Sequence, residues 1–294
     1  LAKMYIQKYN IKTILCSIGI QDQVEYICAK QCIGLSVKIH SFKHAGIESL
    51  FFEPGLLEPY LERNNFPPRT QYLHSNLEKA YYKNHLDINT IVLGRLDLPI
   101  QRKKSSFNNK ILYSLGPDNY YSYKEMDRLT SDKERYSLIK ETISLSLFYD
   151  NILDIKIHPS QKNNQFEWLK LMKKQSLENN FNILIEGTID RIFYKYDLII
   201  IDLLHTRVFT SLLYINIPII IYVPEGIKLN NVNFLELSKR AFIIRKPSQI
   251  NNIIKRMNEN KLKIKSSKKF NKIFLNHPND NLLFKDVLKK MECK

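Results

Sequence analysis

The sequence predicts an α/β protein of two domains, each built on a parallel β-sheet. Short runs of β-branched residues alternate with helical segments, which is the pattern of strands joined by crossover helices. Two of these runs, 198–202 and 215–223, are almost entirely apolar, as expected of strands that are buried on both faces. The segment 101–109 is polar, charged and without period, and it indicates a linker between two such series. We therefore expect two sheets that face a central cleft.

The individual elements follow from the same pattern. In the first domain we expect strands at residues 12–19, 35–40 and 88–94, and helices at 21–31 and 75–83. In the second domain we expect strands at 110–116, 152–158, 181–187, 196–202, 218–223 and 241–246, and helices at 134–147, 165–174, 208–214 and 248–260. The domains are then residues 1–103 and 104–260, with a basic tail or helix at 261–294.

The charge is concentrated at the C-terminal end. The chain carries a net charge of +16, and the segment 239–294 alone has 16 Lys/Arg and four Asp/Glu. Nucleic acid, an anionic membrane surface and phosphorylated substrates are all compatible with this balance. We expect no nucleic-acid partner, because zinc-finger, RRM and KH signatures are absent from the sequence. The basic region is therefore a candidate for membrane-surface contact.

The cysteine spacing and the hydropathy of the sequence indicate the cellular compartment. The four cysteines show no disulfide or zinc-ligand spacing, so we expect free thiols and a reducing cytosol. No apolar run approaches the roughly 20 residues that span a bilayer. We expect a cytoplasmic protein that can lie peripherally on the inner face of the cytoplasmic membrane.

The pair His158-Pro159 ends a predicted buried strand. Because proline cannot extend a sheet ladder, the chain must turn there, and Ser160 can cap the next helix. His158 is then placed at the edge of the sheet, where it could donate to a phosphate oxygen. A histidine that only caps or fills the core is the alternative.

Other strand ends carry similar candidates. Asp202 ends the strand 196–202, and His205 and Thr206 precede the helix 208–214, where a hydroxyl and free amides could hold phosphate. A simple N-cap at Thr206 and a turn residue at Asp202 form the alternative. Gly116 and Glu186 lie at the ends of two further strands and complete the proposed nucleotide- and phosphate-binding set.

The first domain supplies the candidates for acid–base chemistry. Gly46 in His44-Ala-Gly46 permits close backbone approach, and His44 and Glu48 offer an acid or a base. Asp22 is the third candidate for the catalytic base. The alternative is an ordinary loop at 41–48.

Together these segments resemble the GT-B glycosyltransferases, which consist of two Rossmann-like domains. The stretch 89–98 resembles the end of their first domain, and 190–224 resembles the donor-binding stretch of the second. The first domain is short for that fold, so its opening strands are expected upstream of Leu1. Within the superfamily, the His-Pro pair and the later Ser/Thr position resemble bacterial sialyl- and Kdo-type transferases, which use CMP-sugars, and the CDP-glycerol and CDP-ribitol phosphotransferases.

The resemblance implies a metal-independent glycosyltransferase without a cofactor. A CMP-linked sugar would be the donor and a surface glycan or lipid-linked molecule the acceptor, as in capsule or lipopolysaccharide synthesis. Thr210 stands where many UDP- and GDP-sugar enzymes have a ribose-binding Glu, which favours cytidine. A polyol-phosphate transferase, a non-catalytic GT-B module and a UDP-sugar 2-epimerase are the alternatives.

Overall fold

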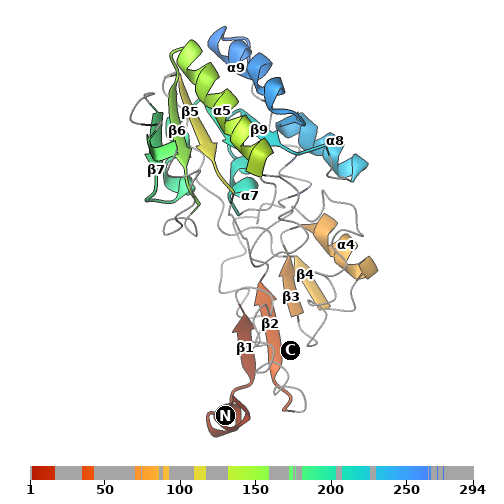
Figure 1. Cartoon of the computed structure of the whole chain (residues 1–294). Coiled ribbons are helices and arrows are strands. Elements are labelled where there is room, and N and C mark those ends of the chain that lie inside the picture. The colour runs from red at the N-terminus through yellow and green to blue at the C-terminus, as the bar shows by residue number, and fades with distance from the viewer. Residues whose placement is uncertain are drawn as a thin grey trace. The chain divides into compact units, whose positions relative to one another are not determined.

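The protein forms two compact units, Leu1–Leu98 with Lys268–Lys294, and Pro99–Ser267. A computed structural model describes residues 2–16, 35–42, 70–73, 75–85, 89–92, 109–116, 132–158, 172–174, 176, 181–202, 207–225, 230–263, 265, 270 and 274. The boundaries predicted from the sequence lay at 103/104 and 260/261. Each unit contains a parallel sheet, so the predicted α/β class is confirmed (Figure 1).

The first unit holds a four-stranded sheet in the order β1-β2-β3-β4. Its strands are β1 (Thr13–Cys16), β2 (Lys38–Phe42), β3 (Thr70–Leu73) and β4 (Asn89–Val92). Every neighbouring pair is parallel, and the spatial order follows the chain order. The sequence did not predict β3, because its Thr-Gln-Tyr-Leu stretch is short and places a glutamine, Gln71, in the interior.

Two helices are described in the first unit. The helix α1 (Ala2–Lys8) contributes Ile6 to a small apolar cluster with Ile39 of β2. The helix α4 (Asn76–His85) begins with a capping box. In it the backbone N–H of Glu78 donates to Ser75 Oγ at 3.1 Å, and the N–H of Ser75 donates to Glu78 Oε2 at 3.2 Å. This reciprocal pair explains why the predicted helix at 75–83 starts where it does.

The second unit holds a six-stranded parallel sheet in the order β10-β9-β8-β5-β6-β7. The strands are β5 (Lys110–Ser114), β6 (Ile152–Lys156), β7 (Phe181–Leu184), β8 (Leu198–Ile201), β9 (Ile219–Tyr222) and β10 (Phe242–Ile244). All six coincide with strands predicted from the sequence. The chain builds outward from β5 to β7, then returns to the other side of β5 and builds outward to β10. This is the doubly wound, Rossmann-type order.

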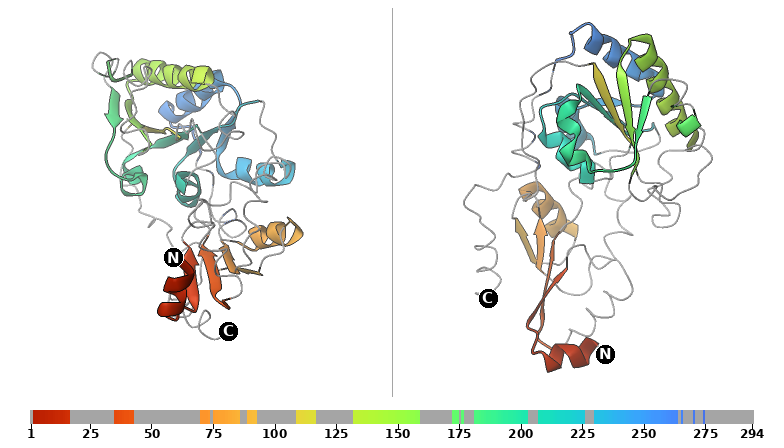
Figure 2. Two further views of the ribbon diagram at one scale, coloured as in Figure 1. Left: turned by 60° about the horizontal axis from the view of Figure 1, so that its bottom comes forward. Right: turned by 90° about the vertical axis from the view of Figure 1, so that its left-hand side faces the viewer.

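Helices cover both faces of this sheet (Figure 2, right). On one face lie α5 (Asp132–Phe148) and α9 (Ile250–Asn258), side by side. On the other lies α7 (Arg207–Tyr214), while α8 (Asn231–Arg240) leads into β10. Short 3-10 turns occur at η5 (Ile189–Arg191), η6 (Phe193–Lys195) and η7 (Pro247–Gln249). The helices predicted around α5, α7 and α9 are therefore confirmed.

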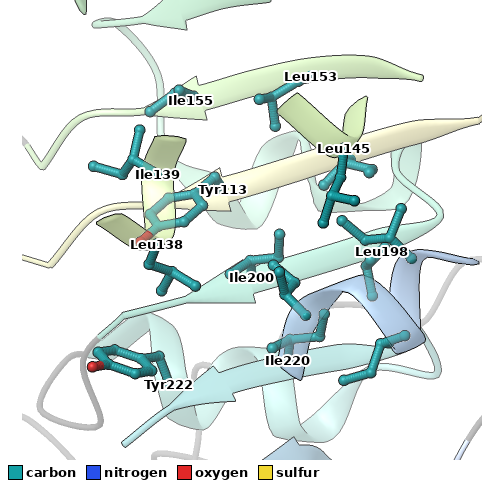
Figure 3. Close-up of a cluster of buried hydrophobic side chains, with 14 of the residues drawn as sticks. Tyr113, Leu138, Ile139, Leu145, Leu153, Ile155, Leu198, Ile200, Ile220 and Tyr222 are labelled. Carbon is teal, nitrogen blue, oxygen red and sulfur yellow. The ribbon is translucent and has the colours of Figure 1, made fainter. Parts of the chain in front are cut away.

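The core beneath α5 and α9 is built from alternate strand residues. Ile111, Tyr113, Ile155, Leu198 and Ile200 face these helices and are fully buried (Figure 3). Their neighbours along the strands, such as Ile199 and Ile221, are equally buried on the opposite face. Burial on both faces explains the unbroken β-branched runs that characterise these strands in the sequence.

Arg240 joins α7 to the strand that follows it. Its guanidinium donates to the carbonyl oxygens of Leu213 at 2.7 Å and Leu212 at 3.1 Å, and also to those of Ile215 and Ile217. The last carbonyls of a helix have no partner within the helix. Arg240 supplies donors for them from a side chain that is itself 1% exposed, and burial lowers its pKa to about 10.

We predict that Arg240→Met lowers the free energy of unfolding by about 2–4 kcal/mol, since several buried carbonyls lose their donor. Urea unfolding followed by circular dichroism measures the change. Lys239→Met is the matched control, because the Lys239 side chain is 60% exposed and its removal should matter by about 0.5 kcal/mol or less. Equal effects of the two substitutions would contradict the assigned role of Arg240.

Candidate functional site

The strand order of the six-stranded sheet reverses between β5 and β8. Crossover connections leave this point in opposite directions, and in doubly wound sheets ligands bind beyond the carboxyl ends of the strands at such a point. Gly116 follows β5 and Asp202 follows β8, and both were predicted as site residues. The backbone N–H of Gly116 donates to Asp202 Oδ1 at 2.6 Å. The two predicted residues are thus brought together at the switch point.

Asp202 is held from the interior of the unit. Its side chain is 0% exposed, and Arg135 from the first turn of α5 places Nε 3.1 Å from Asp202 Oδ2. Burial raises the pKa of Asp202, while the Arg135 guanidinium and the Gly116 N–H act in the opposite direction. Asp202 therefore orients the chain after β5 rather than presenting its carboxylate at the surface. Direct phosphate binding by Asp202 stays a prediction.

Two buried tyrosines lie near this ion pair. Tyr113 of β5 and Tyr222 of β9 point toward the same helix-covered face (Figure 3). Burial raises the pKa of Tyr113 well above its ordinary value, and the Asp202 carboxylate adds to the effect. The pKa of Tyr222 is raised to about 12 by burial and by Glu134. Both phenols are therefore neutral, so neither adds a charge to this part of the unit.

His158 lies two residues beyond the end of β6 and is half-buried. Burial lowers its pKa, and the ammonium group of Lys156 lowers the pKa further. The imidazole therefore stands at the predicted edge of the sheet in its neutral form. Its predicted contact with a phosphate group stays a prediction. Pro159 and Ser160, its predicted partners, lie outside the described residues.

Lys156, the last residue of β6, is a polar residue that the sequence analysis missed. It is 5% exposed. Its Nζ donates to the carbonyl oxygens of Ile157 and Ile185 at 3.0 Å each and to that of Leu184 at 3.4 Å. Burial lowers its pKa, and the nearby Glu186 carboxylate opposes that shift. The signal in the sequence was a lysine at a core-facing position two residues before the His-Pro pair.

Glu186 and Gly187 form the turn after β7. Glu186 is exposed, and its charge acts on Lys156. Gly187 has a φ of +79°, which side-chain-bearing residues rarely adopt, while the space around it is open. The glycine is therefore needed for the backbone turn and not for a close contact. Predicted nucleotide binding by Glu186 remains untested.

The ends of β9 and β10 are joined by another basic side chain. Arg245 Nη1 donates to the carbonyl oxygens of Pro224 at 2.9 Å and Val223 at 3.2 Å. Its guanidinium also lies over the Phe234 ring of α8, 5.4 Å from the ring centroid. Arg245, like Arg135 and Lys156, was not predicted, because a lone basic residue carries no motif.

The remaining predicted site residues cannot be placed. His44, Glu48, Asp22, His205 and Thr206 all lie outside the described residues. Within the described residues, no group of three or more His, Cys, Asp or Glu side chains is arranged to hold a metal ion. The helices described here include none with the length and hydrophobicity needed to traverse a bilayer.

We predict that Arg135→Met destabilises the protein by about 3–5 kcal/mol at pH 7, because it leaves the Asp202 carboxylate buried without a counter-ion. The loss applies to ionised Asp202, whose pKa is already raised by burial and rises further without Arg135. The destabilisation should therefore grow as the pH rises through the raised pKa of Asp202 and be small below it. Urea unfolding at several pH values measures it.

Lys140→Met is the control for this experiment, since Lys140 is an exposed lysine of the same helix. It should produce neither the large loss nor its pH dependence. A pH-independent effect of Arg135→Met would show that the guanidinium contributes packing alone.

Comparisons with known proteins support the fold. No model of a known protein family matches the chain, and no curated protein matches it. Among solved structures, UDP-GlcNAc 2-epimerase from Methanocaldococcus jannaschii, in complex with UDP-GlcNAc and UDP, is similar over 99% of this chain and 78% of its own. The TM-score is 0.62 and the sequence identity 11%.

Two further structures are similar in the same way. Anabaena Alr3699/HepE in complex with UDP and glucose covers 100% of this chain and 81% of its own, with a TM-score of 0.58 and 12% identity. The S. aureus MnaA–UDP co-structure covers 87% and 69%, with a TM-score of 0.55 and 10% identity. These likenesses, together with the two parallel sheets, show that the chain has a GT-B-type fold of two Rossmann-like units.

Proposed function

We propose that this protein is a nucleotide-sugar enzyme of the GT-B type, and that its second unit binds the nucleotide diphosphate of the donor. The observation that carries the proposal is the reversal of strand order between β5 and β8, with His158 at the end of β6 on the same carboxyl edge. The three solved structures compared above support it, because each of them holds UDP, and one also holds UDP-GlcNAc.

The proposed roles follow from the chemistry of the strand ends. His158 donates a hydrogen bond to a phosphate of the nucleotide sugar. The buried ammonium group of Lys156 adds a positive potential at the same strand end. Thr206 and the amides at the start of α7 are proposed to hold the same phosphates. Preorganised donors of this kind stabilise the charge that develops on the leaving group. The hydrogen bond from Gly116 to Asp202 fixes the chain at residue 116, just after β5.

The nucleotide is proposed to be a pyrimidine. The sequence motifs favoured a CMP-linked sugar, whereas solved structures with this fold contain bound uridine diphosphate. We place UDP-sugars ahead of CMP-sugars for that reason. Sugar transfer to a glycan or lipid-linked acceptor is the proposed reaction, with a base from the first unit, for which His44, Glu48 and Asp22 remain the candidates.

A nucleotide-sugar 2-epimerase is the second candidate function. Two structures of such enzymes from Methanocaldococcus jannaschii, with TM-scores of 0.62 and 0.59, are similar to this chain over nearly its full length. An epimerase would convert a UDP-sugar without an acceptor, and product analysis separates it from a transferase. Polyol-phosphate transfer, which would require a CDP-polyol donor, is distinguished in the same assay.

The cofactor requirement and the cellular location of the reaction are also part of the proposal. No metal or cofactor is expected to take part, and the enzyme is proposed to act in the cytoplasm at the membrane surface. The basic segment 239–294 is the part of the chain that would meet anionic lipid.

We predict that uridine diphosphate stabilises the protein against thermal unfolding and that GDP does not. A ligand at about 100 times its dissociation constant should add about 2.7 kcal/mol. Differential scanning fluorimetry with UDP, CMP, CDP and GDP measures the shift. A response confined to cytidine nucleotides would restore the CMP-sugar assignment, and the absence of any response would overturn nucleotide binding.

We predict that His158→Ala weakens nucleotide binding about 10- to 100-fold, since a hydrogen bond to a charged group contributes about 1.5–3 kcal/mol. Isothermal titration calorimetry measures the affinity. Lys140→Met, on the exposed side of α5, should bind nucleotide like the parent. Unchanged affinity in His158→Ala would place the phosphate elsewhere.

A further inference from the structure

We propose that Lys156 is a positioning residue: its ammonium group fixes the backbone that leads into His158 and places a positive charge near the imidazole. Its connection to ligand binding rests on the function proposed above, but its effect on His158 does not. Lys156 belongs to none of the motifs recognised in the sequence. Its assignment comes from the contacts at the ends of β6 and β7.

The contacts of Lys156 indicate an ammonium ion. The three partners of its Nζ, the carbonyl oxygens of Ile157, Leu184 and Ile185, can only accept hydrogen bonds. A protonated amine has three N–H donors and matches all three acceptors. A neutral amine would leave one acceptor unmatched and turn its lone pair toward carbonyl oxygens. Burial lowers the pKa of this lysine, yet the surrounding carbonyls and the Glu186 charge favour the protonated form.

The same contacts fix the backbone immediately before His158. The ladder between β6 and β7 continues one step past the strand, where the N–H of Ile157 donates to the Leu184 carbonyl at 3.1 Å. Beyond that point the carbonyls of Ile157 and Ile185 have left the regular ladder. Lys156 Nζ lies 3.0 Å from each of them. The side chain thus links the two strand ends at the residue that precedes His158.

The charge of Lys156 acts on His158 directly. The Lys156 charge adds to burial in lowering the pKa of His158, and the Glu186 charge opposes the burial that lowers the pKa of Lys156. A fixed cation disfavours a second positive charge nearby, so the imidazole stays neutral and keeps one N–H donor and one acceptor nitrogen. An anionic phosphate at this edge would then meet a permanent cation and a neutral donor.

The experiment is an NMR titration of the histidine C–H resonances in the absence of any nucleotide. His158→Gln assigns the His158 signal. In the parent protein His158 should titrate below the ordinary value of about 6.5. In Lys156→Met, which keeps an unbranched side chain of similar size and removes its charge, the midpoint of the His158 titration should move up. Lys173→Met, at an exposed lysine of the same unit, should leave it unchanged.

Two results would overturn the proposal. One is a parent His158 that titrates at or above the ordinary value, a measurement that does not depend on Lys156→Met and stands even if that variant fails to fold. The other is a midpoint that is the same in Lys156→Met and the parent. Lys156→Arg, which retains the charge, should keep the midpoint low.

The link to function is tested separately by calorimetry with UDP. If nucleotide binds, Lys156→Met should weaken it about tenfold or more, and Lys173→Met should not. A shifted His158 midpoint without nucleotide binding in the parent would support the role of Lys156 and overturn the proposed function. Nucleotide binding by the parent with an unshifted His158 midpoint would support the proposed function and overturn the role of Lys156.

Discussion

The hydrogen bond from the Gly116 N–H to the Asp202 carboxylate is the contact on which the proposed binding edge of the second unit depends. It joins the ends of β5 and β8, the two strands between which the order of the sheet reverses. Because Asp202 is completely buried, its charge requires the guanidinium of Arg135, and that requirement ties the start of α5 to the same point. One carboxylate thereby sets the position of a loop, a strand end and a helix start.

Basic side chains recur in this unit as donors to backbone carbonyls. Lys156 donates to carbonyls at the ends of β6 and β7. Arg240 donates to carbonyls at the end of α7, and Arg245 donates to carbonyls just after β9. Lys265 donates to the Ala241 carbonyl at 3.1 Å and lies over the Phe242 ring. Part of the strong positive charge near the C-terminal end is therefore used inside the fold. The net charge alone overstates the number of cations that an external partner could meet.

The hydrophobic periodicity of the sequence predicted the strands of the second unit well. It could not predict residues whose roles depend on tertiary contacts. The strands β8 and β9 were found because burial on both faces demands apolar, β-branched runs, which are visible in a single sequence. β3 was missed because Gln71 interrupts such a run. Arg135 and Lys156 were missed for a different reason. Their roles depend on carboxylates and carbonyls that are brought near by the fold, from positions up to 67 residues away in the case of Asp202.

The proposed binding edge differs from a surface patch in how its charge acts. Surface lysines are screened by salt over about 8–10 Å and contribute little individually. Lys156 is 5% exposed and held by carbonyl oxygens, so water and salt screen its charge less than that of an exposed lysine. In such surroundings a fixed charge acts more strongly and needs little reorganisation when an anion arrives. A sheet edge with a buried cation next to a neutral imidazole is thus suited to a phosphate group, even though few of the chain's many lysines take part.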